Sequence, residues 1–503
     1  MKIRSRLSED QMKIVASLED QMKITTLLML VMMLHTANGS AATGTANFQH
    51  LNVREALAGT KIHPMSDLES YQEFSKSNTT AEECKLKLNL LHRDHITSNL
   101  SHHHHHRLNE RIKRDINRVT SISRRLHITK KITKNDEGFV EEEFGSQVVS
   151  GMELGSGEYL VRIGVGSPVR NQYMVIDSGS DLMWVQCQPC TSCYQQSDPV
   201  FDPSDSATFT GVSCESTVCN RLDDQNSGCG HSGRCRYEVS YGDGSFTTGT
   251  LALETLTFGP TTVRNVAIGC GHRNQGMFVA AAGLLGLGGG PMSFIGQLGS
   301  QIDQAFGYCL VSRGGTGSYG SLVFGRGSVS SSSATWVPLV QNPQSLTFYY
   351  VSLVGLGVGG IRLPIPEHLF ELTELGDGGV IIDTGTAVTR LPTQAYEIFR
   401  NYFVSGTVGL PRVPGAQIFD TCYDLSGFEM VRVPTVSFHF YGGSILTLPA
   451  RNFLIPTDEM GTFCFAFAPS NLGVSIIGNI QQEGIQISID GEKGLLGFGP
   501  NTC

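Results

Sequence analysis

The sequence predicts a mainly β protein built from two similar halves, and three observations support this fold class. Gly is abundant, with 58 of 503 residues, and only 17% of residues are charged; this composition fits a β-rich globular chain better than a helical bundle or a disordered tail. From about residue 157, short β-rich runs alternate with Gly, Ser and Asp. Within that region one short motif, an apolar run that ends in Asp, occurs twice.

The expected strands are short runs of β-branched, aromatic and other apolar residues bounded by turn residues. In the first half they cover 158–166, 171–177, 237–245, 250–259 and 262–271. After a Gly/Ser-rich stretch at 315–334 they resume at 348–360, 380–383, 435–443 and 474–480. Helical candidates are few, namely 297–303 and 393–403. The two halves divide near 335–347.

The first 150 residues differ in charge from the rest of the chain. They carry a net charge of +3, whereas residues 151–503 carry −12 and contain a single Lys, Lys493. Such a division fits a basic propeptide docked on an enzyme that works at low pH, and it fits a solvated tail equally well. A body this acidic argues against nucleic-acid binding.

The amino end has the pattern of a secretory signal. The hexapeptide EDQMKI occurs at 9–14 and again at 19–24, so Met22 is a candidate for the true start. The apolar run Leu27–Leu34 is too short to span a bilayer, and small residues follow at 36–44. We expect cleavage within 38–44. No second apolar run of spanning length and no lipid-anchor tail follow, so no membrane anchor is expected.

The resulting division of the chain has four parts. Residues 1–41 are the extension and signal peptide, 42–145 a propeptide, 146–340 the N-terminal lobe and 341–503 the C-terminal lobe. The propeptide carries the glycosylation sequons at Asn78 and Asn99. It also carries the histidine run 102–106, for which a solvated low-complexity loop is a better explanation than a metal site.

Cysteine usage indicates an oxidising compartment. Of 13 cysteines, one is Cys84 and the other twelve lie between 187 and 503. An even dozen behind a signal peptide favours a disulfide framework. Cys187, Cys190 and Cys193 form C-x-x-C-x-x-C, a spacing that also occurs in zinc and redox sites, but in a secreted chain disulfides are the expected use.

The repeated motif carries the chemistry. Residues 173–185 read YMVIDSGSDLMWV and 379–392 read GVIIDTGTAVTRLP, so each apolar run ends in Asp, Ser or Thr, Gly, and Ser or Thr. A second echo follows each Asp at a similar distance, GLLGLG at 283–288 and SIIGNI at 475–480. The two Asp residues are Asp177 and Asp383.

A physical role follows from this pattern. Gly179 and Gly385 permit tight turns, and the hydroxyls of Ser180 and Thr386 can orient the carboxylates. If the halves pack face to face about a pseudo-twofold axis, Asp177 and Asp383 meet. Two adjacent carboxylates cannot both ionise easily and share a proton near acid pH. One can then act as general base on a bound water while the other acts as general acid, without a metal or other cofactor.

These residues resemble the pepsin-like aspartic proteases over about 157–503. The resemblance implies a bilobal fold with pseudo-twofold related lobes, a central cleft, and catalytic Asp177 and Asp383. The supporting catalytic loops are Ser178, Gly179 and Ser180 in one half and Thr384, Gly385 and Thr386 in the other. YGDGS at 241–245 is similar to the flap that closes over substrate, which makes Tyr241 and Gly242 substrate-binding residues and Trp184 the partner of the flap tyrosine.

The subtype resembles the plant atypical aspartic proteases, the nepenthesin-like and guard-cell type. The motif WVQCQPC at 184–190 and the cysteine-rich insert 187–235 carry this resemblance, together with LHRD at 91–94 and VVSGMELGSGEYLVRIGVGSP at 148–168. No long insert of saposin type is found in the second half.

The resemblance also implies a set of disulfide pairings. They are Cys187–Cys190, Cys193–Cys270, Cys214–Cys235, Cys219–Cys229, Cys309–Cys503 and Cys422–Cys464.

On this interpretation the protein is a secreted aspartic endopeptidase, made as a zymogen, that cleaves polypeptides at acid pH. Its own propeptide is then an intramolecular inhibitor whose Lys and Arg side chains lie over the ionised Asp pair. We expect a monomer in the secretory pathway, destined for the extracellular space (apoplast), with the vacuole and the endoplasmic reticulum as alternatives.

Three other functions fit parts of the sequence. The main alternative is a non-catalytic binding or inhibitor protein of xylanase-inhibitor type, which has the same fold; the complete set of both Asp, both hydroxyls and the flap Tyr argues against it. A nucleotide enzyme is disfavoured because GLLGLGGG at 283–290 lacks G-x-G-x-x-G spacing and a Walker lysine. A serine hydrolase is disfavoured because no G-x-S-x-G elbow is present.

Overall fold

The computed structural model describes residues 47–58, 60, 86–93, 104–132 and 159–501, with short gaps at 223–226, 231, 242–244, 277, 279–280, 312–319, 330–333 and 472. The expected signal region, the sequons at Asn78 and Asn99, Cys84, Gly242 and Cys503 lie outside the described residues. Within the described part of the chain, no helix is long and apolar enough to cross a membrane.

The N-terminal lobe is built around the strand that ends in Asp177. Strand β4 (Arg170–Asp177) pairs antiparallel with β3 (Tyr159–Val165) and parallel with β11 (Gly283–Gly286). Strand β11 also pairs antiparallel with β5 (Trp184–Gln186), so the chain leaves Asp177, turns and passes back beside β11. The long hairpin of β9 (Phe246–Phe258) and β10 (Thr261–Gln275) completes the sheet.

The C-terminal lobe repeats this arrangement around Asp383. Strand β18 (Val380–Ile382) pairs parallel with β28 (Ser475–Ile477), and β28 pairs antiparallel with β19 (Thr389–Pro392). Strand β28 thus pairs with β18 and β19 in the same way as β11 pairs with β4 and β5. The two echoes in the sequence are therefore equivalent strands in space, and the bilobal pepsin-like fold class predicted from them is confirmed.

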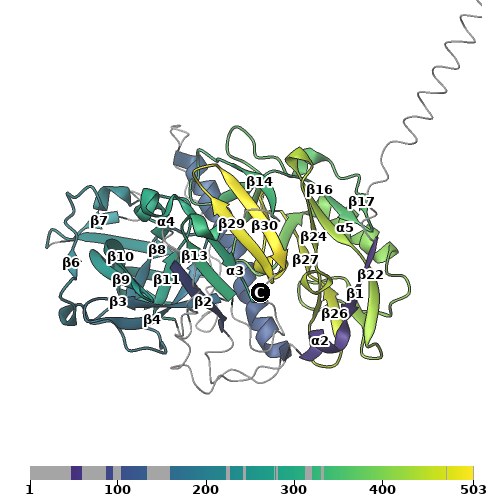
Figure 1. The fold of residues 1–503 in the computed structure, drawn as a ribbon, viewed down its shortest axis with the longest axis horizontal. Helices are drawn as coiled ribbons and strands as arrows, with labels where there is room; N and C mark the ends of the chain where they lie inside the picture. Colours follow the sequence, from purple (N-terminus) through teal and green to yellow (C-terminus); the bar gives the residue numbers. More distant parts are fainter. Residues whose placement is uncertain are drawn as a thin grey trace, which may run out of the picture. The chain divides into compact units, whose positions relative to one another are not determined.

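One antiparallel sheet extends across both lobes. Its strands follow the order β3, β2 (Leu86–His92), β13 (Gly320–Phe324), β12 (Ala305–Cys309), β29 (Ile485–Asp490), β30 (Leu495–Asn501) and β14 (Thr335–Val340). Figure 1 shows β29 and β30, in yellow, between the teal and the green lobes. Strand β2 comes from the basic front part of the chain, where KLKLNLLHRD has strand-like alternation.

The remaining elements complete the two lobes. In the N-terminal lobe they are β6 (Thr210–Gly211), β7 (Ser227–Cys229), β8 (Cys235–Ser240) and α4 (Phe294–Leu298). In the C-terminal lobe they are β15 (Tyr349–Val351), β16 (Leu353–Val358), β17 (Ile361–Arg362), α5 (Thr393–Ser405), β20 (Arg412–Val413), β21 (Cys422–Asp424), β22 (Met430–Pro434), β23 (Val436–Phe440), β24 (Ile445–Leu448), β25 (Leu454–Pro456), β26 (Thr462–Phe465), β27 (Phe467–Ser470) and α6 (Asn479–Gln482).

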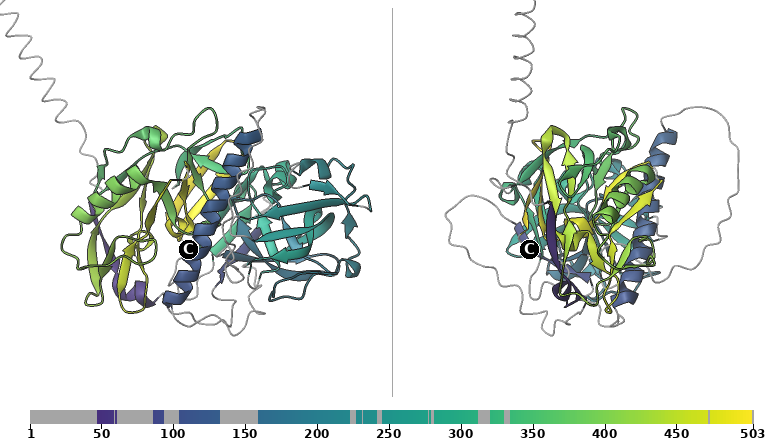
Figure 2. Two further views of the ribbon diagram at one scale, coloured as in Figure 1. Left: turned by 180° about the vertical axis from the view of Figure 1, so that it is seen from behind. Right: turned by 90° about the vertical axis from the view of Figure 1, so that its right-hand side faces the viewer.

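The front part of the chain also contributes β1 (Phe48–Asn52), α2 (Val53–Ala58) and the long helix α3 (His104–Ile132). Strand β1 pairs with β22. Helix α3 crosses the junction of the two lobes in the left view of Figure 2 and runs along one side of the lobes in the right view. The solvated loop expected for the histidine run is wrong for His104, His105 and His106, which begin this helix.

Apolar side chains at helical spacing explain why this segment is a helix. Leu108 and Ile112 pack in one buried cluster with Ala387 and Val388. Further along the helix, Val119 and Ile122 pack in another with Phe348, Tyr350 and Ile381. The 3.6-residue period places these four side chains on one face of α3. That face lies on the C-terminal lobe.

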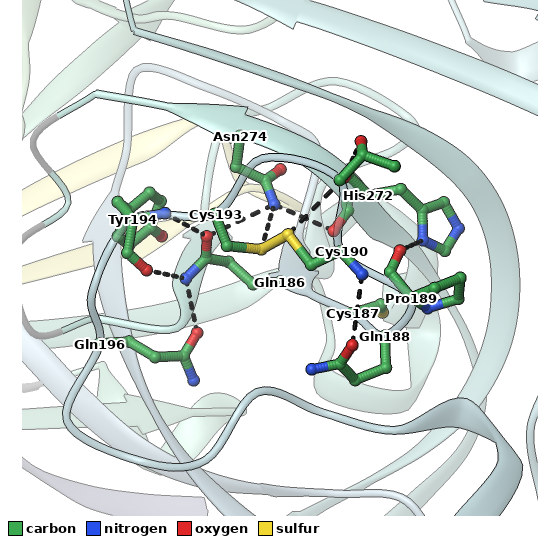
Figure 3. The surroundings of a disulfide bond; sticks show 12 residues. Gln186, Cys187, Gln188, Pro189, Cys190, Cys193, Tyr194, Gln196, His272 and Asn274 are labelled. Atoms are coloured by element: carbon green, nitrogen blue, oxygen red, sulfur yellow. Dashed lines mark hydrogen bonds between the residues drawn. A yellow bond between two sulfur atoms is a disulfide. The ribbon is translucent and has the colours of Figure 1, made fainter.

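Two of the expected disulfides around the C-x-x-C-x-x-C motif are wrong. The structure pairs Cys187 with Cys270 and Cys190 with Cys193, instead of Cys187–Cys190 and Cys193–Cys270. The reason is strand pairing: β5 runs parallel to β10, so Cys187, just after β5, lies beside Cys270, with 5.3 Å between their Cα atoms. Cys190 and Cys193 then close a short loop, against which the side chain of Asn274 packs (Figure 3).

The two pairings expected for the rest of the cysteine-rich insert are also wrong. Cys214–Cys229 and Cys219–Cys235 replace the expected Cys214–Cys235 and Cys219–Cys229. Cys229 and Cys235 lie opposite each other in the β7–β8 hairpin, so the two partners are distinguished only by where the preceding loop places Cys214 and Cys219. Sequence spacing contains no information about that placement.

The second half has one observed disulfide that agrees with expectation. Cys422 of β21 and Cys464 of β26 lie directly opposite each other in an antiparallel pair, with Cα atoms 4.1 Å apart, and are bonded. Cys309 lies in β12, and its expected partner Cys503 is outside the described residues.

Candidate active site

The two predicted catalytic loops hold their carboxylates in the same way. The hydroxyl of Ser180 donates to Asp177 Oδ2 at 2.6 Å, and the Gly179 N–H donates to Asp177 Oδ1 at 3.0 Å. In the other half, the Thr386 hydroxyl donates to Asp383 Oδ2 at 2.6 Å and the Gly385 N–H to Asp383 Oδ1 at 3.0 Å. Each carboxylate therefore has one oxygen fixed by a hydroxyl and the other by a backbone amide, in charge-assisted hydrogen bonds.

The loops also contact each other. Ser178 N–H donates to Thr384 Oγ1 at 3.1 Å, and Thr384 N–H donates to Ser178 Oγ at 3.0 Å. A Cβ on Gly179 would lie 2.7 Å from Asp383 Oδ1, and one on Gly385 would lie 2.8 Å from Asp177 Oδ1. Both positions thus require glycine, because each loop lies against the carboxylate of the other half.

The predicted flap pair is in contact. The indole N–H of Trp184 donates to the hydroxyl of Tyr241 at 2.9 Å. Phe278 packs edge-on against both rings, with centroids 5.0 Å from Trp184 and 5.5 Å from Tyr241. Burial raises the pKa of Tyr241, so its hydroxyl stays neutral. The tip of the expected flap, including Gly242, lies outside the described residues.

An arginine of helix α3 lies between the two carboxylates. Nη2 of Arg118 donates to Asp177 Oδ1 at 2.6 Å and to Asp383 Oδ1 at 3.1 Å, and its Nε donates to Asp383 Oδ2 at 3.1 Å. Only 2% of the Arg118 side chain is exposed. One guanidinium therefore bridges the carboxylates of both halves.

The charges at this site support one another. Burial alone would raise the pKa of Asp383, but the charge of Arg118 and its hydrogen bond outweigh burial and lower that pKa below the ordinary value. Burial opposes the charge on Arg118, whereas Asp177 and Asp383 raise its pKa. The arrangement is a buried cation between anions, in which each ion offsets the desolvation of the others.

Two more charged residues of α3, Asp115 and Arg111, contact the C-terminal lobe. Asp115 Oδ1 accepts from the N–H groups of Ala387 and Val388 at 2.7 and 2.8 Å, and Asp115 Oδ2 pairs with Arg390. Arg111 pairs with Glu483 at 3.3 Å.

Beyond Arg118, Arg125 contacts the loop of Asp177 directly. Its Nη1 donates to the Gly179 carbonyl at 2.8 Å, and its guanidinium lies 5.0 Å from the centre of the Phe348 ring. Burial, then the charge of Arg118, lowers the pKa of Arg125. Basic side chains of α3 thus contact both loops, Arg118 through the two carboxylates and Arg125 through the Gly179 carbonyl.

The structure brings together both Asp residues, all six loop residues, Trp184 and Tyr241. The sequence motifs do not indicate Arg118, Asp115, Phe278 or Arg390. The spacing of Leu108, Ile112, Val119 and Ile122 would have indicated helix α3, and hence a face that includes Arg118. Within the described residues, no group of three or more His, Cys, Asp or Glu is arranged to hold a metal ion.

Comparisons with known proteins agree with this geometry. Two family models match, the xylanase inhibitor N-terminal domain over residues 159–326 and the xylanase inhibitor C-terminal domain over 348–500. Among solved structures, one titled edgp superposes with a TM-score of 0.57 at 19% identity, over 70% of this chain and 92% of that one. Conglutin gamma from lupine seeds gives 0.55 at 21% identity, over 69% and 92%. At these identities the likeness concerns the fold.

Curated relatives are closer in sequence. The protein named aspartic protease in guard cell 2, from Arabidopsis thaliana, is 63% identical over 441 residues, which are 88% of this chain and 93% of that protein. The aspartic proteinase nepenthesin-1 of Nepenthes gracilis is 39% identical over 366 residues, 71% of this chain and 81% of its own. On its fold, its paired Asp loops and these relatives, the chain belongs to the pepsin-like aspartic proteases, within their plant nepenthesin-like, guard-cell branch.

Proposed function

We propose that the protein is a secreted aspartic endopeptidase, made as a zymogen, that hydrolyses peptide bonds at acid pH with a water activated between Asp177 and Asp383. The observation that supports this most directly is the pair of equivalent carboxylates, one from each half, close enough to share a single guanidinium nitrogen. The family membership agrees with it.

In the active enzyme the two carboxylates share one proton, because two ionised groups this close repel each other. The ionised member takes a proton from the water as it attacks the peptide carbonyl, while the protonated member donates to the carbonyl oxygen. The roles then exchange as the amine leaves. Ser180 and Thr386 fix the outer oxygens, so the oxygens that do chemistry keep their orientation.

Helix α3 is the proposed inhibitor. While Arg118 lies between Asp177 and Asp383, its guanidinium occupies the place of the water, so no water can be bound and activated between the two carboxylates. The pKa of Asp383 is lowered in this state, so its contact with Arg118 is fully present above the pKa of the released carboxyl. The contact is lost as pH falls toward the lowered value. Acid therefore weakens docking and permits activation.

The division of the chain is part of this proposal. Residues 1–41 direct the chain to the secretory pathway, 42–145 form the propeptide, and 146–340 and 341–503 form the two lobes of a monomeric enzyme. Asn78 and Asn99 are the proposed glycosylation sites, and the extracellular space is the proposed destination.

Asparagine variants of the two carboxylates test the function. The acid-treated precursor should cleave a peptide library and be inhibited by pepstatin, whereas Asp177→Asn and Asp383→Asn should each lose activity by several orders of magnitude. Asp424→Asn, at the exposed end of β21 in the C-terminal lobe, is the matched control and should cleave as the wild type does. Unchanged cleavage by either of the first two variants would exclude this mechanism.

The alternative is a non-catalytic binding protein, and the names of the two matching family models favour considering it. The complete pair of loops argues for the protease. The same peptide-library measurement separates the two, since a binding protein would show no cleavage at any acid pH while still retaining its fold.

A further inference from the structure

We propose that Arg390 is a specificity-determining residue, which selects polypeptides with an Asp or Glu side chain within about two residues of the cleaved bond. This inference rests on the proposed protease function and adds to it the chemistry of one substrate side chain. The starting observation is the group that occupies the site while helix α3 is docked.

That group is the carboxylate of Asp115. Its Oδ1 accepts two backbone hydrogen bonds, from Ala387 at 2.7 Å and Val388 at 2.8 Å, and its Oδ2 pairs with Nη2 of Arg390. Asp115 is 2% exposed and Arg390 7% exposed. Two amides and a guanidinium that converge on one carboxylate form a complete anion site.

The site adjoins the catalytic loop. Ala387 directly follows Thr386, whose hydroxyl holds Asp383. On the helix, Asp115 lies three residues from Arg118, a rise of about 4.5 Å. An extended peptide advances about 3.3 Å per residue. A substrate that crosses the two carboxylates therefore places a side chain at this site within about two residues of the bond that is cut.

The pseudo-twofold repeat places Arg390 on the substrate side of its lobe. Arg390 follows Asp383 by seven residues, as Trp184 follows Asp177. Arg390 lies opposite Ile476 in the β19–β28 pair, as Trp184 lies opposite Leu284 in the β5–β11 pair. Trp184 contacts the flap residue Tyr241. The equivalent position in the second lobe thus holds a cation where the first holds an aromatic ring.

Departure of helix α3 leaves this anion site without its carboxylate. Among the described residues, the ion pair observed for Arg390 is that with Asp115, and Arg390 Nε has no hydrogen-bond partner there. Removing one partner of a buried ion pair leaves the other charge uncompensated, which is costly. A peptide that supplies Asp or Glu restores the pair and the two amide hydrogen bonds, whereas an amide or apolar side chain restores less.

The test compares cleavage of matched peptides by the acid-activated full-length precursor. Each peptide has one position near the cut occupied by Asp, Asn or Lys, and the assay is done near pH 5.5, above the ordinary Asp pKa of about 3.9. At one of these positions the wild type should prefer Asp over Asn by about tenfold in kcat/KM. Arg390→Gln should bring this ratio close to one, and Arg390→Glu should favour Lys over Asp.

Two further variants separate charge from folding. Arg390→Lys, which keeps the charge, should retain part of the preference. Arg400→Gln removes an arginine of α5 that pairs with Asp420, and it should keep the wild-type ratio. The inference is overturned if the wild type cleaves the Asp and Asn peptides equally at every position, or if both Arg390→Gln and Arg390→Glu keep the wild-type ratio. Absence of any cleavage by the wild type would instead overturn the protease function on which it rests.

Discussion

Ser178 and Thr384 hold the two halves of the protein together through a reciprocal pair of hydrogen bonds, in which each backbone N–H donates to the hydroxyl of the other residue. Both residues are buried. The bonds join the residues that directly follow Asp177 and Asp383 in the chain, so we expect the spacing of the two carboxylates to depend on them.

Ser178→Ala and Thr384→Val should each leave one buried N–H without an acceptor. We expect a loss of about 1–3 kcal/mol in the free energy of unfolding, together with a lower kcat, because the carboxylates are no longer held at one distance. Denaturant unfolding and peptide cleavage measure the two effects. Ser405→Ala, which removes an exposed hydroxyl at the end of α5, is the control. Equal behaviour of all three variants would show that the cross-lobe bonds are dispensable.

Arg118→Gln should raise the pH at which the precursor becomes active. The wild-type contact lowers the pKa of Asp383 and resists acid until the pH approaches that lowered value. Without the positive charge, we expect the midpoint of activation to move upward by about one pH unit or more. Lys113→Gln on the same helix, where 56% of the Lys side chain is exposed, should leave the midpoint in place. The role of Arg118 is refuted if the two variants activate at the same pH.

Tyr241→Phe should test the flap contact. The variant keeps the ring against Phe278 but removes the acceptor of the Trp184 indole N–H, whose separation from the Tyr hydroxyl is 2.9 Å. Loss of a buried hydrogen bond of about 1 kcal/mol corresponds to about fivefold in kcat/KM. Tyr402→Phe, at an exposed position of α5, is the matched control. A wild-type rate for Tyr241→Phe would show that the Tyr241 hydroxyl does not contribute to catalysis.

The disulfide pattern can be checked without mutation. A non-reducing digest of the purified protein should yield peptides that join Cys187 to Cys270 and Cys190 to Cys193. Recovery of Cys193 linked to Cys270 would refute the observed pairing.

The two bonds should also differ in their contribution to stability. Their sequence separations are 83 and 3 residues, so loop-closure entropy gives about 4.5 kcal/mol for the first bond and about 1.5 kcal/mol for the second. Replacing both cysteines of one pair by serine, with thermal unfolding as the measurement, should reproduce this order. The opposite order would show that loop closure does not determine the effect.

The local motifs were sufficient to predict the fold class and the paired loops. The repeated motif consists of adjacent residues: an apolar strand followed by Asp, a hydroxyl residue and Gly. It therefore predicts the strands β4 and β18 at the positions where they are found. The helix over 393–403 is likewise found as α5, whereas 297–303 is divided between the end of α4 and a 3-10 turn.

What could not be predicted depends on contacts between distant residues. The partner of Cys187 is decided by the parallel pairing of β5 with β10, which no spacing rule contains. The histidine run is most simply explained as a low-complexity loop. The sequence therefore indicates neither the start of α3 nor the position of Arg118 on it. The basic charge of the front segment indicates that this segment docks on the acidic body. Which of its arginines contacts the two carboxylates depends on the register of helix α3.

Strand β2 has a neighbour on each side: it pairs with β3 through three residues and with β13 through five. Cutting the chain after α3 would therefore not release the amino-terminal piece, because β2 would remain hydrogen-bonded within the sheet that joins the lobes. If this piece left, β3 and β13 would each lose a neighbouring strand, and neighbouring strands in a sheet lie about 4.8 Å apart. The backbone N–H and C=O groups exposed on β3 and β13 would then need new hydrogen-bond partners. If the chain is cut after α3, release of the front segment thus requires an exchange of strands, and the nicked chain should stay a single particle until another segment pairs with β3 and β13.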